Sequence, residues 1–150
     1  MLYGYTRALW RRAGTAAEAD PHPADVARLA ELVHAYNEEA TGCRDGLDFA
    51  VFRRDERGRL EAGISGYTWA GIGHIDLLWA REDLRGKGVG RELMAEAEAE
   101  MVRRGCKAVH VESHTFQAPG FYERLGYERV FSRVDVPPGH AEVLLRKALG

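Results

Sequence analysis

Three closely spaced glycines among basic residues form the sharpest chemical signal in the sequence. The run is Arg85-Gly86-Lys87-Gly88-Val89-Gly90-Arg91, between a predicted strand that ends near Ala80 and a predicted helix that begins near Val89. Glycines lack the Cβ atoms that would keep a backbone from wrapping an anion, and the free N–H groups of a helix N-terminus point at it. The basic side chains add positive charge around the same loop. The loop therefore predicts a site for a diphosphate.

Two other phosphate-binding loops do not fit this run. A P-loop needs a Lys-Ser or Lys-Thr after its last glycine, and none follows Gly90. The dinucleotide fingerprint G-x-G-x-x-G, counted from Gly86, needs a glycine where Arg91 stands. Taken by itself, the run also fits a flexible turn with solvated cations. Its position between a predicted strand and a predicted helix favours the phosphate-binding interpretation.

The helices that must position this loop follow from apolar spacing. The predicted helix 89–104 ends at Gly105, and its buried face is formed by Val89, Leu93, Ala97 and Met101. A helix over 24–39 begins at Asp20 or Pro23 and ends at Gly42. Its apolar residues recur at threes and fours, so we expect one buried face made of Val26, Leu29, Ala30, Val33 and Tyr36.

The strands follow from alternation and turn residues. We expect them at 6–10, 47–53, 60–69, 75–80, 108–113, 127–134 and 142–146, with a turn at 55–58, a break at Gly71 and Gly73, and a short helix at 119–125. Alternation places Ile75, Leu77 and Trp79 on one face and His74, Asp76 and Leu78 on the other. One strand–helix–strand crossover must be parallel. The chain is therefore predicted to be a single α+β domain over 1–150 with a mixed, mostly antiparallel sheet.

Composition excludes several classes of protein. The 150 residues carry 21 basic and 23 acidic side chains for a net charge of −2, which offers no basic face for nucleic acid or an anionic membrane. Cys43 and Cys106 stand far apart with no metal-type spacing, so no metal is expected. No signal peptide or membrane-spanning stretch is visible, and a cytoplasmic location is expected.

A second motif gives the loop its context. Three segments follow one another along the chain: Leu77-Leu78-Trp79-Ala80, then Arg85-x-x-Gly88-x-Gly90, and then Gln117-Ala118-Pro119-Gly120-Phe121-Tyr122-Glu123-Arg124-Leu125-Gly126-Tyr127. Together they resemble the GNAT superfamily of acyl-CoA-dependent N-acyltransferases. The resemblance covers roughly residues 46–148. It implies a three-layer fold in which two parallel strands splay apart and admit the pantetheine arm of acetyl-CoA, the cosubstrate. It also makes a homodimer the default.

The resemblance implies a set of coenzyme contacts. Backbone groups of the strand before the loop would hold the pantetheine and polarise the thioester, and the loop would hold the pyrophosphate. Thr115 stands where many members carry Asn, which puts that contact in doubt, and Gln117 is a substitute. The expected cofactor-binding residues are Leu78, Trp79, Ala80, Arg85, Gly86, Lys87, Gly88, Val89, Gly90, Arg91, Thr115 and Gln117.

The implied reaction is direct attack of a primary amine on the thioester, and it needs a base and an acid. An amine like that of lysine is mostly ammonium at neutral pH. Asp76 is the first choice as base and Glu112 the second, with His74 or His110 behind them. Tyr122 matches the family tyrosine that protonates the leaving thiolate. The cysteines are not expected to act as nucleophiles, because the family transfers the acyl group directly.

The acceptor is expected to be a small-molecule or peptide amine. Tyr36, Tyr67, Trp69 and His140 are the expected substrate-binding residues, although each is also an ordinary core or turn residue type. The alternative function is a non-catalytic acyl-CoA sensor that keeps the loop but not turnover. Amine-dependent release of the coenzyme thiol separates the two.

Overall fold

The computed structural model describes residues 16–150, which form two compact units divided after Gly42. The strand expected at 6–10 lies outside the described residues. No helix in the described part of the chain is long and apolar enough to cross a membrane.

The unit before Cys43 contains helix α2, Pro23–Thr41, at the position predicted. His22 caps it, because its Nδ1 accepts a hydrogen bond from the Ala24 N–H at 3.2 Å, and Pro23 at the first position supplies a helical φ. The helix ends at Gly42, which has a left-handed φ of 72°. None of the residues of α2 is buried, so the burial predicted from its apolar spacing is not supplied by this unit itself.

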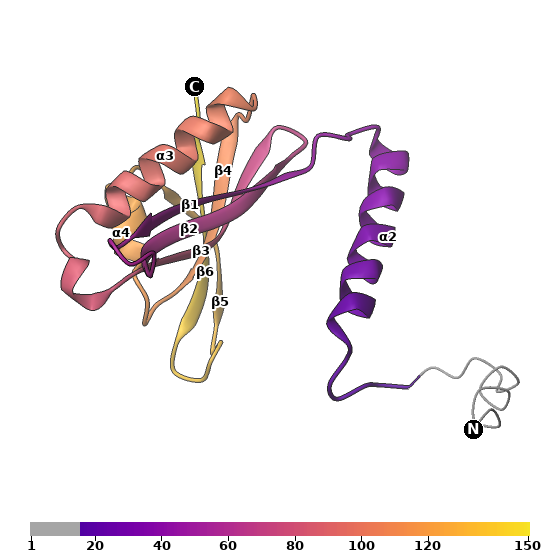
Figure 1. Ribbon diagram of the computed structural model, residues 1–150, viewed down its shortest axis with the longest axis horizontal. Helices are drawn as coiled ribbons and strands as arrows, with labels where there is room; N and C mark the ends of the chain where they lie inside the picture. Colours follow the sequence, from indigo (N-terminus) through magenta and orange to yellow (C-terminus); the bar gives the residue numbers. More distant parts are fainter. Residues whose placement is uncertain (1–15) are drawn as a thin grey trace, which may run out of the picture. The chain divides into compact units, whose positions relative to one another are not determined.

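The unit Cys43–Gly150 is built on a six-stranded sheet of order β1-β2-β3-β4-β6-β5 (Figure 1). Only β3 and β4 pair in parallel, and the other neighbours are antiparallel. The predicted mixed sheet and α+β fold are confirmed. The strands are β1 Leu47–Arg54, β2 Leu60–Trp69, β3 Ile72–Ala80, β4 Ala108–His114, β5 Glu128–Val134 and β6 Ala141–Ala148. The helices of this unit are η1 Glu82–Leu84, α3 Val89–Arg103 and α4 Pro119–Arg124.

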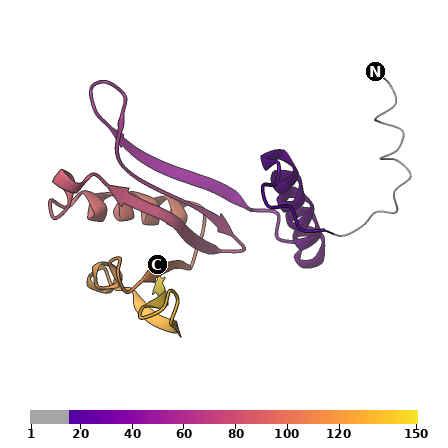
Figure 2. The ribbon, with the colours of Figure 1, turned by 90° about the horizontal axis from the view of Figure 1, so that it is seen from below.

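Helix α3 lies along one face of β1, β2 and β3 and encloses the core (Figures 1 and 2). It buries the four residues predicted from its spacing, Val89, Leu93, Ala97 and Met101, and also Met94. The largest fully buried side chains of the unit are Ile64, Met94, Met101, Leu145, Val109 and Val143. Each such side chain contributes about 1.5–3 kcal/mol by leaving water. The opposite face of the sheet carries the residues that alternate with these, and we call it the open face.

Strand β3 begins three residues before the predicted Ile75, and Gly73 lies inside it. A Cβ on Gly73 would overlap the Met101 side chain, so this glycine permits close packing of the sheet against α3 and does not break the strand. The chain turns instead at Ala70 and Gly71, which both have positive φ.

A β-bulge at Asp76 overturns the predicted alternation along β3. Ser65 pairs with Leu77 and Gly66 pairs with Ile75, so Asp76 has no partner on β2. The extra residue shifts the strand by one position. Leu78 therefore packs against the core that contains Ile75, whereas Leu77 is 69% exposed. Ala80 follows Leu78 to the core side, and Trp79 follows Leu77.

Gly66 is required at this bulge. A Cβ there would overlap the His74 carbonyl oxygen, which belongs to the backbone and cannot move aside as a side chain would. The missing side chain thus lets β2 and β3 approach closely where the bulge forms.

Candidate active site

The parallel strands β3 and β4 pair only over their first halves. Their register runs from Ile72 with Ala108 to Ile75 with Val111 and then stops. Beyond that point β3 continues to Ala80 on β2 alone, and β4 continues to His114 on β6 alone. The predicted divergence of the two strands is therefore present (Figure 1). The register places its start at the bulged Asp76.

The segment Asp76–Ala80 consequently has β2 along one edge and no strand along the other. The N–H and C=O groups that point away from β2, in the stretch that includes Leu78 and Trp79, have no ladder partner. The Ala80 carbonyl is an exception, because it accepts a hydrogen bond from Arg85 Nε at 3.0 Å. An extended ligand can lie along this edge as an added strand.

The loop after β3 leads directly into the N-terminus of α3. Gly86 and Gly88 have left-handed φ values of 72° and 87°, which side chains rarely adopt. Gly88 is the N-cap, with no side-chain cap, and its carbonyl accepts the Glu92 N–H at 3.0 Å. The N–H groups of Val89, Gly90 and Arg91 therefore have no acceptor inside the helix. This is an anion-binding geometry.

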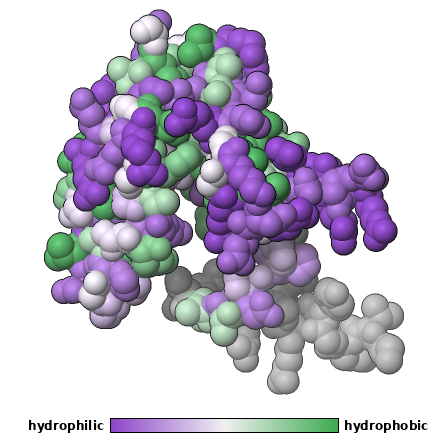
Figure 3. All heavy atoms as spheres, turned by 90° about the vertical axis from the view of Figure 1, so that its left-hand side faces the viewer, coloured by the Kyte–Doolittle hydropathy of each residue, from purple (hydrophilic) through white to green (hydrophobic). Residues whose placement is uncertain are grey.

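The other loop residues are either exposed cations or residues that make structural contacts. Lys87 and Arg91 are exposed and form no ion pair within residues 16–150. Gly90 lies against α4, where an added Cβ would stand 3.2 Å from Phe121 Cζ, so its glycine permits helix packing. Arg85 braces the loop through its bond to Ala80. Figure 3 looks at this side of the unit and shows mostly hydrophilic residues there.

Two carboxylates flank the divergence on the open face. Asp76 lies on β3 and Glu112 follows the last β3–β4 pair on β4. In the described part of the chain neither makes a hydrogen bond or an ion pair. His74 stacks on Tyr67 with ring centroids 4.5 Å apart and meets the edge of His110 at 5.5 Å. The structure thus brings the two proposed bases together with both histidines and one expected substrate residue.

Burial shifts the pKa values in this cluster. Burial and the nearby charge of Asp48 raise the pKa of Asp76, against an opposing effect of His74. Burial and the charge of His110 lower the pKa of His74 below its usual value, so its neutral form is favoured at neutral pH. Burial raises the pKa of Tyr67, and the charges of Asp76 and Glu112 add to that effect. Among residues 16–150, no three His, Cys, Asp or Glu side chains are placed to hold a metal ion.

Tyr122 lies on α4 with its side chain in the core. It is 7% exposed, and its ring contacts Phe121 and Tyr127 at centroid distances of 5.1 and 5.8 Å. Its hydroxyl has no hydrogen-bond partner in the part of the chain that the structure describes, yet it is not enclosed. Burial raises the pKa of Tyr122, so the hydroxyl keeps its proton at neutral pH. A hydroxyl that is protonated at neutral pH can donate to a basic group that forms beside it during a reaction.

Thr115 and Gln117 both have contacts of their own at the end of β4. The Thr115 hydroxyl accepts the Ala141 N–H at 3.0 Å, and the Gln117 Oε1 accepts the His114 N–H at 2.9 Å. His140 lies beside them, 5.1 Å from the Phe116 ring. These contacts close the turn after β4 and extend its pairing with β6.

Two further expected substrate residues have other surroundings within their own units. Tyr36 lies on α2, in the unit before Cys43, and is 70% exposed. Trp69 is at the end of β2, where its Nε1 donates to the Cys43 carbonyl at 3.2 Å.

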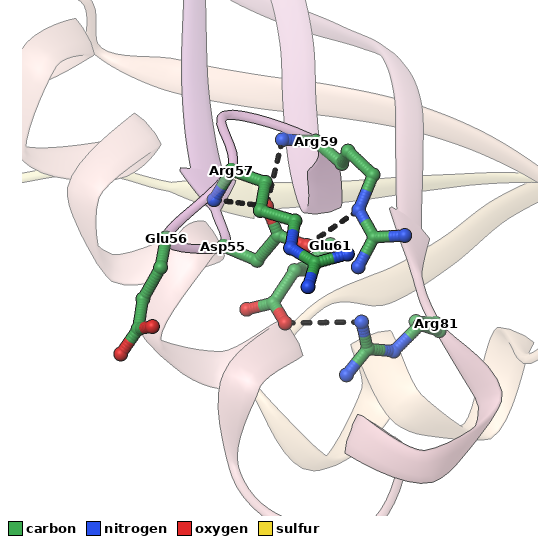
Figure 4. A pocket seen from close by; sticks show the side chains of 6 residues that line it. All are labelled: Asp55, Glu56, Arg57, Arg59, Glu61 and Arg81. Atoms are coloured by element: carbon green, nitrogen blue, oxygen red, sulfur yellow. Dashed lines mark hydrogen bonds and ion pairs between the residues drawn. The ribbon is translucent and has the colours of Figure 1, made fainter.

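A surface pocket of about 410 Å³ lies at the β1–β2 turn beside Arg81 (Figure 4). Its charges largely pair with one another. Asp55 accepts the Arg57 and Arg59 N–H groups at 2.9 Å, and Glu61 pairs with Arg81 at 3.0 Å. Because Asp55 and Glu61 are already paired with arginines, these two carboxylates stabilise the turn and the start of the loop segment.

Sequence reasoning missed a cavity on the open face. It is lined by Glu112, Phe131, Arg133, Glu142 and Leu144. Alternation along β6 indicates that Glu142 and Leu144 share a face. Placing that face beside Glu112, however, requires the strand order β4-β6-β5.

Comparison with known proteins agrees with this geometry. Residues 13–127 match the model of the acetyltransferase (GNAT) family. Over 103 residues, 67% of this chain and 75% of the relative, the chain is 44% identical to a protein of Streptomyces morookaense named blasticidin-S acetyltransferase. Over 113 residues, 75% of this chain and 82% of the relative, it is 30% identical to an acetyltransferase of Agrobacterium fabrum.

Solved structures show the same fold. An acetyltransferase from Bacillus cereus superposes with a TM-score of 0.74 at 26% identity, covering 89% of this chain and 98% of that one. A Bacillus anthracis protein solved in complex with acetyl coenzyme A gives a TM-score of 0.60 at 15% identity, covering 69% and 63%. With the family model matching most of its length, the chain belongs to the GNAT family and is an N-acetyltransferase.

Proposed function

We propose that this protein transfers an acetyl group from acetyl-CoA to a primary amine of a small polar molecule, in the cytoplasm. The observation that carries the proposal is the end of β3–β4 pairing at Ile75 and Val111. That opening lies between the glycine-rich loop and two carboxylates that have no partner in the described part of the chain. A thioester and an amine can therefore meet there from two sides.

The coenzyme end of the proposal uses the loop and the open edge of β3. Backbone N–H groups at the start of α3, with Lys87 and Arg91, hold the pyrophosphate. The pantetheine arm runs along Asp76–Ala80, where the strand has no neighbour. Free N–H groups near Leu78 and Trp79 polarise the thioester carbonyl as negative charge develops on its oxygen.

The proton transfers use one carboxylate and one phenol. Asp76 takes a proton from the acceptor ammonium, directly or through water, and frees the nitrogen lone pair. The nitrogen then bonds to the acetyl carbon, the carbon–sulfur bond breaks, and the leaving thiolate takes the proton of Tyr122. The nitrogen loses its second proton as the amide forms, and this proton passes through water to the Tyr122 phenolate and restores the phenol. The raised pKa values of both side chains fit these roles, because Asp76 becomes a stronger base and Tyr122 stays protonated.

The acceptor is proposed to be blasticidin S or a molecule of similar chemistry. The support is the 44% identity to a relative that carries this substrate in its name. The open face also suits a cationic acceptor, since neither Asp76 nor Glu112 forms an ion pair within residues 16–150.

Release of free coenzyme thiol from acetyl-CoA tests the proposal across a panel of amines that includes blasticidin S. We expect release that depends on the amine, with mass spectrometry showing one added acetyl group. Tight binding of acetyl-CoA with no turnover for any amine would instead indicate the non-catalytic module.

A further inference from the structure

The cavity on the open face has walls from three neighbouring strands. Glu112 on β4 pairs in register with Leu144 on β6, and Leu144 pairs with Phe131 on β5. Arg133 and Glu142 form the next cross-strand pair. The volume is about 220 Å³. This is below the usual 300–1,000 Å³ of a site that encloses a whole drug-sized ligand, so the cavity fits one end of such a molecule.

The cavity presents one carboxylate that no cation neutralises in the part of the chain that the structure describes. Glu142 bonds to Arg133, with its Oε2 accepting from Arg133 Nε at 2.6 Å. Glu112 has no hydrogen bond or ion pair within residues 16–150. Leu144 and Phe131 supply apolar surface beside it, and Phe131 is 60% exposed. A ligand here meets a free negative charge next to an aromatic ring.

Glu112 also connects this cavity with the opening between β3 and β4. It is the first residue of β4 beyond the last pair with β3. Its charge reaches Tyr67 and His74, whose pKa values it raises, although burial keeps that of His74 below normal. A group bound in the cavity is therefore next to the cluster that contains Asp76.

We propose that the cavity anchors a guanidinium or amidinium group of the acceptor, separate from the amine that is acetylated. A planar cation can bond to both oxygens of Glu112 and is weakly hydrated, so it tolerates contact with Phe131 and Leu144 better than an ammonium does. It can also lie against the face of the Phe131 ring. Glu112 then binds the acceptor, and proton removal belongs to Asp76. This inference rests on the proposed function for the identity of the bound molecule.

Methylguanidinium is the probe, tested first as an inhibitor of blasticidin S acetylation. We expect competition with the acceptor in the wild type. Glu112→Gln is expected to raise the inhibition constant and the acceptor KM at least tenfold with kcat changed by less than about twofold, as for loss of binding shared by ground and transition states. Glu128→Gln is the matched control, because Glu128 is another exposed carboxylate on the sheet, has no ion pair among the described residues and lies outside the cavity. It should behave as the wild type.

Three kinetic results would overturn the inference. These are non-competitive inhibition, equal inhibition constants in Glu112→Gln and the wild type, and a large fall in kcat of Glu112→Gln with loss of the acidic limb of its pH profile. The last result would make Glu112 the base.

A binding measurement separates this inference from the proposed function. Methylguanidinium is titrated into the isotope-labelled chain, and the Leu144 methyl signals are followed by NMR. We expect them to shift in the wild type and in Glu128→Gln but not in Glu112→Gln. Shifts without any turnover would contradict the proposed function and support guanidinium binding in the cavity. Turnover without shifts would contradict guanidinium binding in the cavity.

Discussion

Two side chains carry the proposed proton transfers, and the surroundings of each prepare it differently. Asp76 sits at a bulge, where it has no partner on β2 and projects from the strand that leads to the loop. Tyr122 is held by the core through its ring while its hydroxyl stays without a partner in residues 16–150. Both pKa values are raised by burial, which strengthens Asp76 as a base and keeps Tyr122 protonated.

Replacing Tyr122 with Phe should lower kcat about 10- to 1000-fold, as for loss of a general acid, with little change in the Kd of acetyl-CoA. Tyr127→Phe is the matched control. The Tyr127 hydroxyl donates to Glu98 Oε1 at 2.9 Å, so this variant should lose about 1–3 kcal/mol of unfolding free energy and keep its turnover. Steady-state kinetics and thermal unfolding distinguish them. Unchanged turnover in Tyr122→Phe would remove this residue from the reaction.

The acidic limb of kcat/KM should report Asp76. Because its pKa is raised, activity should fall with decreasing pH through a value above that of an ordinary aspartate. Because the pKa of Asp76 is higher in the folded than in the unfolded chain, its protonated form favours folding. That contribution to the free energy of unfolding is present at low pH and is lost as pH rises through the folded pKa. Asp76→Asn should therefore unfold no more easily at neutral pH while kcat falls about 10²- to 10⁴-fold.

A variant of the neighbouring aspartate sharpens this prediction. The charge of Asp48 helps to raise the pKa of Asp76. Asp48→Asn should move the acidic limb to lower pH and leave the plateau rate unchanged. A limb that stays in place would show that another group controls the profile.

At the scale of the elements, glycine placement fixes the geometry of the site. Gly66 permits the bulge by leaving room for the His74 carbonyl, and Gly88 turns the chain into α3 with a left-handed φ. The first creates the divergence of β3 from β4, and the second exposes the helix N-terminus. The two features lie at opposite ends of the segment Asp76–Gly88, so in the proposed reaction one stretch of chain contacts both the thioester and the pyrophosphate.

Gly88→Val should abolish measurable acetyl-CoA binding, because its side chain projects from the loop proposed to wrap the pyrophosphate. Gly58→Val is the control, since Gly58 also has a positive φ, 76°, with open space around it, but belongs to the β1–β2 turn. Both variants should lose about 1–2 kcal/mol or more of unfolding free energy from the strained φ. Calorimetric titration should show normal binding for Gly58→Val alone. Normal binding by Gly88→Val would contradict the loop assignment.

At the scale of the whole molecule, the sequence predicts the order of elements well where apolar periodicity is strong. The helix over 89–104 and the strand over 60–69 match α3 and β2 within one residue, because packing against the core dictates their spacing. The loop and its position before α3 were also predictable, since glycine and charge act locally. The resemblance to the GNAT superfamily added the coenzyme and Tyr122.

What could not be predicted depends on contacts between distant segments. The bulge at Asp76 reverses the faces of Leu77 and Leu78, and it arises from pairing with β2 that the β3 sequence alone does not reveal. The sequence predicts a strand break at Gly73, because it does not reveal that this glycine packs closely against Met101. The cavity beside Glu112 requires β6 to lie between β4 and β5.

The proposed reaction depends on binding of the pyrophosphate by the start of α3, and a thermal-shift comparison measures this binding. Acetyl-CoA is compared with acetyl-pantetheine, which has the same thioester arm but no pyrophosphate. At about 100 times its Kd, acetyl-CoA should stabilise the protein by about 2.7 kcal/mol, a rise in Tm of roughly 5–10 °C. Acetyl-pantetheine at the same concentration should shift Tm by about 1 °C or less. Equal Tm shifts from the two ligands, or no shift from acetyl-CoA, would contradict pyrophosphate binding at the start of α3.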